Sequence, residues 1–363
     1  MKFELDSQVP PKRREAIRRW RAGFAEWSKR NAFAGCLAQS AGCSGPIIRA
    51  HSIQNSRVLE AVAVDGHVYM FEARPQGVSL VRLGRQEAST FTGFCQKHDT
   101  ELFRTVDFGA QRTFAANSIE QAVTLALRAV AREYWLKLNV RKLLGLLLSA
   151  ARRNDLAEIK RITFLDDEHA RLLMETGHDG PRLFLEDMLI GTRSSTDRLR
   201  RIFHSLFSQV KNGEYHLWRS RIYEIHGQGN VAVSSVFSVE FDLAGNRIGS
   251  IALHADVMEV VLSVMPMVDR TWVVFVYHKR FDDRLRRLFE QLDSCTEDRL
   301  CVAISKMILT YCENAALSPR YVEGLSVEAR TSLENAFAQT LPCARPLDEM
   351  PDCDFFQNRV GLT

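Results

Sequence analysis

The strongest constraint on this sequence is a set of two short cysteine and histidine pairs. Cys36 and Cys43 have six residues between them, and Cys95 and His98 have two. Thiolates and imidazole nitrogens are the ligands that a tetrahedral zinc ion prefers in a structural site. A small module with several glycines gains much of its stability from such an ion. The sequence therefore predicts one structural Zn²⁺ held by these four side chains, and the alternative is four buried residues that never meet.

Composition limits the class of protein. The chain has 363 residues, of which 46% are hydrophobic and 25% charged, so it is neither disordered nor of low complexity. Its 48 basic and 44 acidic residues leave a net charge of +4, which neither indicates nor excludes nucleic acid. No apolar run approaches the roughly 20 residues that span a bilayer, and the first residues lack the apolar core of a signal peptide. We therefore expect a cytoplasmic protein with free thiols and no membrane partner.

The distribution of residue types predicts four regions of different character. Residues 1–30 contain a basic amphipathic helix, and residues 31–112 form the zinc-binding module. Residues 113–215 are helical, and residues 216–363 combine an antiparallel sheet with C-terminal helices. The predicted fold class is α+β, in which a small ββα module of treble-clef type precedes a helical region and a sheet flanked by helices.

Strand signals are concentrated in two places. In the module, residues 58–71 and 77–83 have the composition of strands, and Asp65-Gly66 is a hairpin-turn signal. The later strands are separated by short turns, which predicts an antiparallel meander. These later strands are expected at residues 217–225, 230–243, 246–255, 258–267 and 271–279.

Helix signals fill most of the remaining sequence. Ser118 and Gln121 form a capping box at the start of a helical region that extends to about Ile162, with a break near Leu138–Asn139. The four consecutive polar residues 166–169 are best explained as the acidic first turn of a helix. Further helices are expected at residues 196–211, where Asn212-Gly213 forms the stop, and at residues 281–292, 297–314 and 327–340.

The residues around the two pairs follow an order known from one family of enzymes. A short apolar strand leads from Ile47 to His51, eight residues after Cys43. Asp99 directly follows the second pair and leads into a helix. Over about residues 33–110, this arrangement resembles the HNH, or His–metal finger, nucleases. In that family a histidine lies on a strand after the first zinc knuckle, and a metal ligand lies at the start of the helix after the second.

The resemblance implies a metal-dependent endonuclease that hydrolyses phosphodiester bonds of DNA or RNA. His51 would be the general base that activates water, and Asp99 would hold a catalytic Mg²⁺ or Mn²⁺ ion. The basic side chains of Arg49, Arg57 and Lys97 would contact the nucleic acid. By analogy, a role in bacterial host defence fits this layout, and it leaves open a homo-oligomer or a regulatory protein partner.

The sequence departs from the family pattern at three points. Ala50 stands where many members have an aspartate ligand, and Asp99 replaces the usual histidine. A long segment also separates His51 from Cys95. A second ligand for the catalytic ion would have to come from one of four residues between which the sequence does not choose. These four are Asn55, Asp65, His67 and Asp107.

The alternative to an enzyme is a zinc-finger module without catalysis. Such a module would bind nucleic acid or protein, and the α+β region that follows would sense a ligand or interact with a partner. The two hypotheses differ in what His51 and Asp99 do. An enzyme needs both side chains beside one reacting group, whereas a binding module does not need them at all.

Overall fold

The structure is a computed structural model of the chain. It describes residues 27, 31–38, 42–74, 77–107, 114–172, 174, 181–253, 255–341 and 344–357. The basic amphipathic helix predicted within residues 1–30 lies outside these residues, apart from Trp27. In the described part of the chain, no helix combines the length and apolar character that crossing a membrane requires.

The chain divides into two compact units. One consists of residues 1–34, 72–79 and 134–201, and the other of residues 35–71, 80–133 and 202–363. All four predicted zinc ligands, together with His51 and Asp99, belong to the second unit.

Two strands and a helix form the part of the second unit that carries the predicted site. Strand β1 (Ile47–His51) pairs antiparallel with β4 (Thr90–Cys95), and helix α4 (Gln96–Phe103) follows β4 directly. The register places Ile47 opposite Cys95 and His51 opposite Thr90. The predicted ββα arrangement is therefore present, with Cys95 at the junction of β4 and α4.

The long segment between β1 and β4 folds into a helical turn and a hairpin. The turn consists of a π-helix (Asn55–Leu59) and α3 (Glu60–Val62), so the strand predicted from residue 58 is wrong over its first part. Val58, Leu59 and Val62 are buried along one side of this turn, a helical spacing that the apolar composition concealed. The hairpin consists of β2 (His67–Arg74) and β3 (Gly77–Gly84).

This hairpin joins the large sheet instead of staying with β1 and β4. The sheet has seven strands in the order β3-β2-β9-β6-β7-β8-β5. Strand β2 pairs with β9 (Ala315–Leu317), which in turn pairs with β6 (Val231–Ser238). The insertion between the two ligand pairs therefore connects the predicted zinc module to a sheet whose other strands come from residues 218–317.

The strands β6, β7 (Glu259–Pro266) and β8 (Arg270–His278) form the predicted antiparallel meander. The first strand, β5 (Trp218–His226), pairs along its whole length with β8 and lies at the edge of the sheet. The strand predicted at residues 246–255 is absent from the described residues there. Residues 242–246 instead form a tight turn in which the buried Asp242 carboxylate accepts the N–H groups of Ala244 and Asn246.

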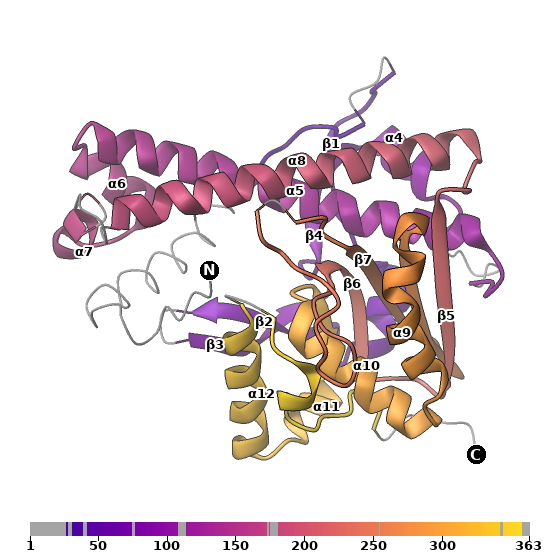
Figure 1. The fold of residues 1–363 in the computed structure, drawn as a ribbon. Helices are drawn as coiled ribbons and strands as arrows, with labels where there is room; N and C mark the ends of the chain where they lie inside the picture. The colour runs from indigo at the N-terminus through magenta and orange to yellow at the C-terminus, as the bar shows by residue number, and fades with distance from the viewer. Residues whose placement is uncertain are drawn as a thin grey trace. The chain divides into compact units, whose positions relative to one another are not determined.

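Three helices cover one face of this sheet through aromatic contacts. The register places Phe237, Phe275 and Tyr277 on the same face, and the pairing of Tyr69 with Leu317 places Phe71 there too. The rings on this face contact Tyr311 of α10 (Glu297–Tyr311), Phe289 of α9 (Asp282–Asp293) and Phe337 of α12 (Val327–Thr340). Figure 1 shows the three helices in front of the strands. This arrangement confirms the predicted α+β class with antiparallel strands flanked by helices.

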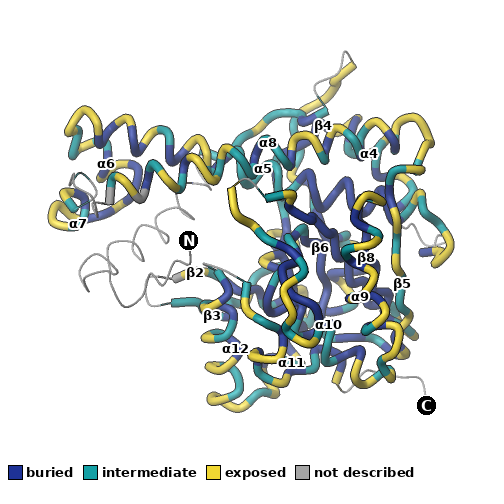
Figure 2. The backbone as a smooth tube through the Cα atoms, viewed as in Figure 1, coloured by how far each residue is buried: buried dark blue, intermediate teal, exposed yellow. Residues whose placement is uncertain are grey.

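Burial follows these layers. The strands β7 and β8 are buried along nearly their whole length, whereas α9 and α12 expose their outer faces (Figure 2). Strands that are covered on both sides read as continuous apolar runs. This explains why the Val- and Phe-rich segments at residues 259–266 and 270–278 showed no alternation of polar and apolar residues.

The helical region begins as predicted, but its first helix is longer than predicted. Helix α5 (Ile119–Arg152) starts at Ser118, whose hydroxyl oxygen accepts the N–H of Gln121 at 3.2 Å. The predicted break near Leu138–Asn139 is wrong, because α5 continues through it. The Asn139 side chain is buried and accepts the N–H of Phe33 at 2.6 Å, so it does not compete for its own helix backbone.

The first unit is built around the second half of α5. Helices α6 (Leu156–Thr163), α7 (Asp167–Leu172) and α8 (Pro181–Asn212) follow, and α8 ends where predicted, at Gly213 with a φ of 69°. Trp27 is buried among leucines and isoleucines of these helices. The core of this unit includes Leu143, Leu144, Leu147, Ile159, Ile162, Leu185 and Leu189.

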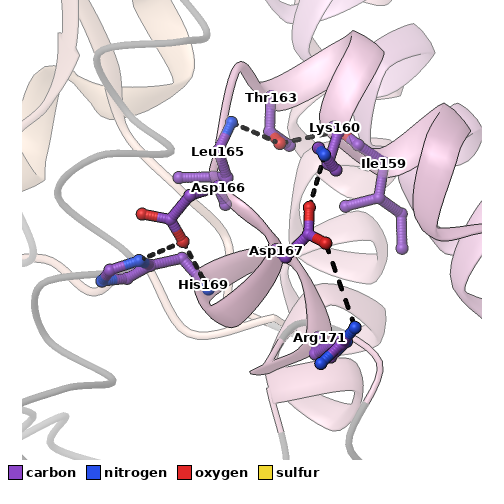
Figure 3. Close-up of polar contacts among 8 residues, drawn as sticks. All are labelled: Ile159, Lys160, Thr163, Leu165, Asp166, Asp167, His169 and Arg171. Atoms are coloured by element: carbon purple, nitrogen blue, oxygen red, sulfur yellow. Dashed lines mark hydrogen bonds and ion pairs between the residues drawn. The ribbon is translucent and has the colours of Figure 1, made fainter.

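The polar residues 166–169 form a helix start, as expected. Asp166 precedes α7, and its carboxylate accepts the N–H of His169 at 2.9 Å and lies 2.6 Å from Nδ1 of the same residue (Figure 3). Asp167 points the other way, toward Lys160 and Arg171 (Figure 3). The residues therefore point in different directions, which fits a cap and two ion pairs better than a metal site.

The stacked pair Phe71 and Phe337 generates a stability prediction. Their ring centroids lie 4.3 Å apart with an interplanar angle of 5°, and both rings are buried. We expect Phe337→Ala to lower the free energy of unfolding by about 3–5 kcal/mol, because it leaves a cavity between α12 and the sheet. Val327→Ala, at a position of α12 that is 77% exposed, should change it by less than about 0.5 kcal/mol. Urea titration of the two variants would measure the difference, and equal effects would contradict this packing.

Candidate metal centre and the residues beside it

The four predicted zinc ligands converge on one point. The Nδ1 atom of His98 lies 3.3 Å from Cys36 Sγ, 3.6 Å from Cys43 Sγ and 3.3 Å from Cys95 Sγ. All four ligand atoms lie within 4.8 Å of one another. Two sequence segments that are more than fifty residues apart thus meet at the start of α4.

These distances suit a tetrahedral ion. Zinc–sulfur bonds of about 2.3 Å and zinc–nitrogen bonds of about 2.0 Å at tetrahedral angles place each sulfur about 3.5 Å from the nitrogen. The observed separations of 3.3–3.6 Å bracket that value. Three thiols and one imidazole nitrogen are also soft donors. A set of this kind, with no carboxylate, binds zinc in preference to Mg²⁺ or Ca²⁺. The cluster can therefore hold a metal ion such as zinc.

Local backbone geometry explains how the first pair reaches the second. Gly42 and Gly45 flank Cys43 with φ values of 129° and 78°, which residues with a side chain rarely adopt, so the chain can turn sharply around the thiol. On the other side, the N–H of Leu37 donates to the carbonyl of Gly93 in β4 at 2.8 Å, which holds the Cys36 turn against that strand. Both turns are thereby fixed beside the end of β4.

Backbone amides support the sulfur atoms. The amides of His98 and Ser44 donate to the Cys95 thiol, and those of Cys95 and Ala38 donate to the Cys36 thiol. Burial opposes charge on Cys95, but these hydrogen bonds, with those of the neighbouring thiols, lower its pKa below the usual value. Burial raises the pKa of Cys36. N–H groups that point at sulfur stabilise the thiolate form, which is the form that binds metal.

His51 ends strand β1, and its ring is held by the turn that precedes β4. Its Nε2 lies 3.2 Å from the carbonyl oxygen of Arg85. A carbonyl oxygen can only accept, so this contact places the proton on Nε2 and leaves the lone pair on Nδ1. Burial lowers the pKa of His51, and the positive charges of Arg128, Arg49 and Arg85 lower it further. The imidazole is therefore neutral near pH 7.

Asp99 lies in the first turn of α4, directly after the ligand His98. Its Oδ1 is buried and has no hydrogen-bond partner among the described residues. Burial raises its pKa, and the nearby Asp107 adds to this effect while Arg128 opposes it. A buried carboxylate oxygen without a hydrogen-bond donor is unusual in a folded protein, because nothing compensates the free-energy cost of its desolvation.

Arg128 is the functional residue that the sequence analysis missed. Its side chain lies in the buried part of α5 with 4% exposure, donates to Asp107 Oδ1 at 2.7 Å, and stands 4.2 Å above the ring of Phe103. Its charge lowers the pKa of both His51 and Asp99, so the two side chains share one electrostatic surrounding. The available signal was a single arginine inside the apolar run LALRAVA of residues 125–131.

The predicted nucleic-acid contacts have different surroundings. Arg49 is exposed on β1 and donates to the Thr90 hydroxyl at 3.4 Å, and Lys97 is exposed in the first turn of α4. Arg57 is only half exposed and belongs to the π-helix after β1. Arg49 and Lys97 therefore have the exposure that a phosphate contact requires, whereas Arg57 has it only in part.

The four candidates for a second oxygen or nitrogen ligand also differ. Asp65 lies in the turn before β2 and His67 is the first residue of that strand, where His67 Nδ1 lies 2.7 Å from the Asp65 carbonyl oxygen. Asp107 is engaged by Arg128. Asn55 donates through Nδ2 to Gln86 at 3.1 Å, and its Oδ1 is buried with no hydrogen-bond partner among the described residues. Of the four, Asn55 thus offers an unengaged buried oxygen.

Comparisons with known proteins do not assign a family or a function to the chain. No protein-family model matches the chain, and no curated protein and no solved structure matches it significantly. The likeness to HNH nucleases therefore rests on the residues described above.

The geometry of the cluster predicts metal content and its loss. We expect the purified protein to contain one zinc ion per chain, and Cys95→Ser to lose that ion and lower the melting temperature, because the buried thiol is a ligand. Cys295→Ser, at a half-buried cysteine outside the cluster, should keep the ion. Elemental analysis and thermal unfolding with and without a chelator would measure both. Full zinc content in Cys95→Ser would contradict the site.

Proposed function

We propose that the chain is a metal-dependent endonuclease whose catalytic groups stand on a zinc-stabilised ββα module. The observation that supports this most directly is the state of two side chains on the module that carries the cluster. His51 is neutral and held in one tautomer, and Asp99 carries a buried oxygen that has no donor among the described residues. The positive charge of Arg128 lowers the pKa of both groups.

His51 would serve as the general base. Since Nε2 is anchored on the Arg85 carbonyl, Nδ1 is the atom that can take a proton from water. The low pKa keeps this nitrogen unprotonated at neutral pH, so the base is ready without a change of conformation. The short distance to a backbone atom also fixes the ring plane, which limits the rotation that would otherwise misalign the proton transfer.

Asp99 would hold the divalent cation. Its unsatisfied Oδ1 fits a hard ion such as Mg²⁺ or Mn²⁺, which prefers carboxylate oxygens, and Asn55 offers a second unengaged oxygen. When bound, such an ion polarises a phosphoryl group and offsets the charge that develops there. Ala50, at the place where many HNH nucleases have an aspartate, is buried in β1 and offers no ligand.

The first prediction of this proposal concerns catalysis. We expect His51→Ala and Asp99→Asn to abolish cleavage of plasmid DNA or of RNA in Mg²⁺ or Mn²⁺, because one removes the base and the other the ligand charge. The matched controls are His226→Ala, an exposed histidine at the end of β5, and Glu101→Gln, exposed on the same helix as Asp99; both should cleave normally. Cleavage that survives both site variants would overturn the roles of these residues.

The pH dependence follows from the state of His51. Only the neutral imidazole can accept a proton, so cleavage should rise with pH through the pKa of His51. Because burial lowers that pKa, the midpoint of this rise should lie below about pH 6.5, the value of an unperturbed histidine. A rate that still increases tenfold per pH unit above neutrality would indicate a different base. If no metal ion supports cleavage of either nucleic acid, the zinc-binding module without catalysis becomes the better interpretation.

Binding should depend on the exposed basic residues. In the Asp99→Asn protein, where binding can be measured without cleavage, we expect Arg49→Ala and Lys97→Ala each to weaken binding. Each should also reduce the slope of log affinity against log salt by about one. Arg286→Ala, an exposed residue of α9 paired with Asp283, is the control and should leave the slope unchanged. Slopes that stay constant in all variants would exclude a phosphate contact at residues 49 and 97.

A further inference from the structure

A buried polar network connects the strand that carries His51 to the centre of the large sheet. Asn314 directly precedes β9 and is 1% exposed, and Ser52 directly follows His51 and is 3% exposed. The Asn314 side chain donates from Nδ2 to Ser52 Oγ at 2.9 Å and to the Ser234 carbonyl at 2.7 Å. Two residues far apart in the sequence are thus joined by a buried hydrogen bond.

The network continues on both sides of this bond. On the sheet side, the backbone N–H of Asn314 donates to the Ser235 hydroxyl at 3.2 Å, and its carbonyl accepts the N–H of Ser234. On the site side, Ser52 donates through both its N–H and its hydroxyl to the Ser89 carbonyl, at 3.1 and 3.2 Å. The Ser89 hydroxyl in turn accepts the N–H of Ile53 at 3.2 Å. The end of β1 is therefore held from two directions.

The same turn holds the imidazole. Ser89 has a φ of 58°, which is rare for a residue with a side chain, and it ends the turn that begins after Gly84 and contains Arg85. The Arg85 carbonyl is the group that contacts His51 Nε2. The hydrogen bonds between Ser52 and Ser89 therefore hold two groups in place. One is the peptide that follows His51, and the other is the turn whose Arg85 carbonyl contacts the His51 ring.

The Asn314 side chain does not form all the hydrogen bonds that an amide can make. Its Oδ1 is buried and has no hydrogen-bond partner among the described residues, a situation that costs stability. An asparagine kept at such a cost is explained if its two donated hydrogen bonds are needed, one to the sheet and one to Ser52. Neither of these bonds touches the metal cluster or a group that reacts in the proposed mechanism.

We propose that Asn314 is a positioning residue for His51, and that through it the central strand β9 sets the geometry of the catalytic base. This inference rests on the proposed function for its consequence in catalysis, but the coupling itself is a property of the fold. Strand β9 lies between β2 and β6, so any ligand or partner that displaces β9 would also displace Ser52 and, with it, His51. The sheet region would thereby regulate the module.

The test compares Asn314→Ala and Ser52→Ala with Ser305→Ala in the full-length, zinc-loaded protein. Ser305 is a suitable control, because its hydroxyl is also buried and makes two hydrogen bonds, to the Cys301 carbonyl and from the Phe355 N–H, without touching the network. We expect Asn314→Ala and Ser52→Ala each to lower kcat by about tenfold to a hundredfold, with little change in KM or zinc content. The double variant should lose no more than the worse single variant, because both remove the same bond.

A second measurement does not depend on activity. The His51 imidazole resonance, identified by its absence in His51→Ala, should titrate closer to a free imidazole in Asn314→Ala and unchanged in Ser305→Ala. This is expected because the ring would leave the Arg85 carbonyl and its buried position. An Asn314→Ala protein with the titration and kcat of Ser305→Ala would overturn the inference.

The two proposals fail separately. If His51→Ala keeps full activity, the assigned base is wrong, yet a shifted His51 titration in Asn314→Ala would still support the coupling. If His51→Ala is inactive and Asn314→Ala behaves like the control in both measurements, the nuclease assignment survives and the coupling does not.

Discussion

The convergence of three sulfurs and one imidazole nitrogen at the start of α4 is the contact on which the candidate site depends. It joins two loops to the end of β4, so the direction of α4 and the place of Asp99 on it follow from the cluster. The paired strands β1 and β4 are short and, by themselves, would be marginally stable. A bound ion would supply the free energy that such a small unit lacks, and it would hold the helix and the strand that carries His51 in one relative position.

Local rules predicted those features that short stretches of sequence determine. The spacing of the ligand pairs identified the cluster, the side chain of Ser118 marked the start of α5, and Gly213 marked the end of α8. The helix at residues 327–340 was predicted with its observed bounds, because its N-cap Ser326 and its periodicity agree. In each case the physical cause lies within a few residues of the feature, so the sequence alone contained it.

Features that depend on distant partners could not be predicted in this way. Asn139 looked like a helix breaker, because nothing in its neighbourhood shows that Phe33 takes up its side chain. Residues 246–255 have the composition of a strand, but the buried Asp242 organises a turn beside them. The charge of Arg128 in α5 lowers the pKa of His51, and Asn314 before β9 hydrogen-bonds Ser52, the residue after His51; both relations appear only when the fold is known. Sequence patterns therefore do not predict polar contacts between residues that are far apart in the chain.

The hairpin inserted between the two ligand pairs has a consequence for how the protein matures. Because Tyr69 of β2 pairs with Leu317 of β9, the contact joins residues about 250 positions apart and closes a very long loop. During synthesis, this pairing cannot form until residue 317 has left the ribosome, although both ligand pairs emerge much earlier. The nascent chain can therefore capture an ion well before the sheet that supports His51 exists. The proposed activity, which needs His51 in place, would therefore arise only late in translation.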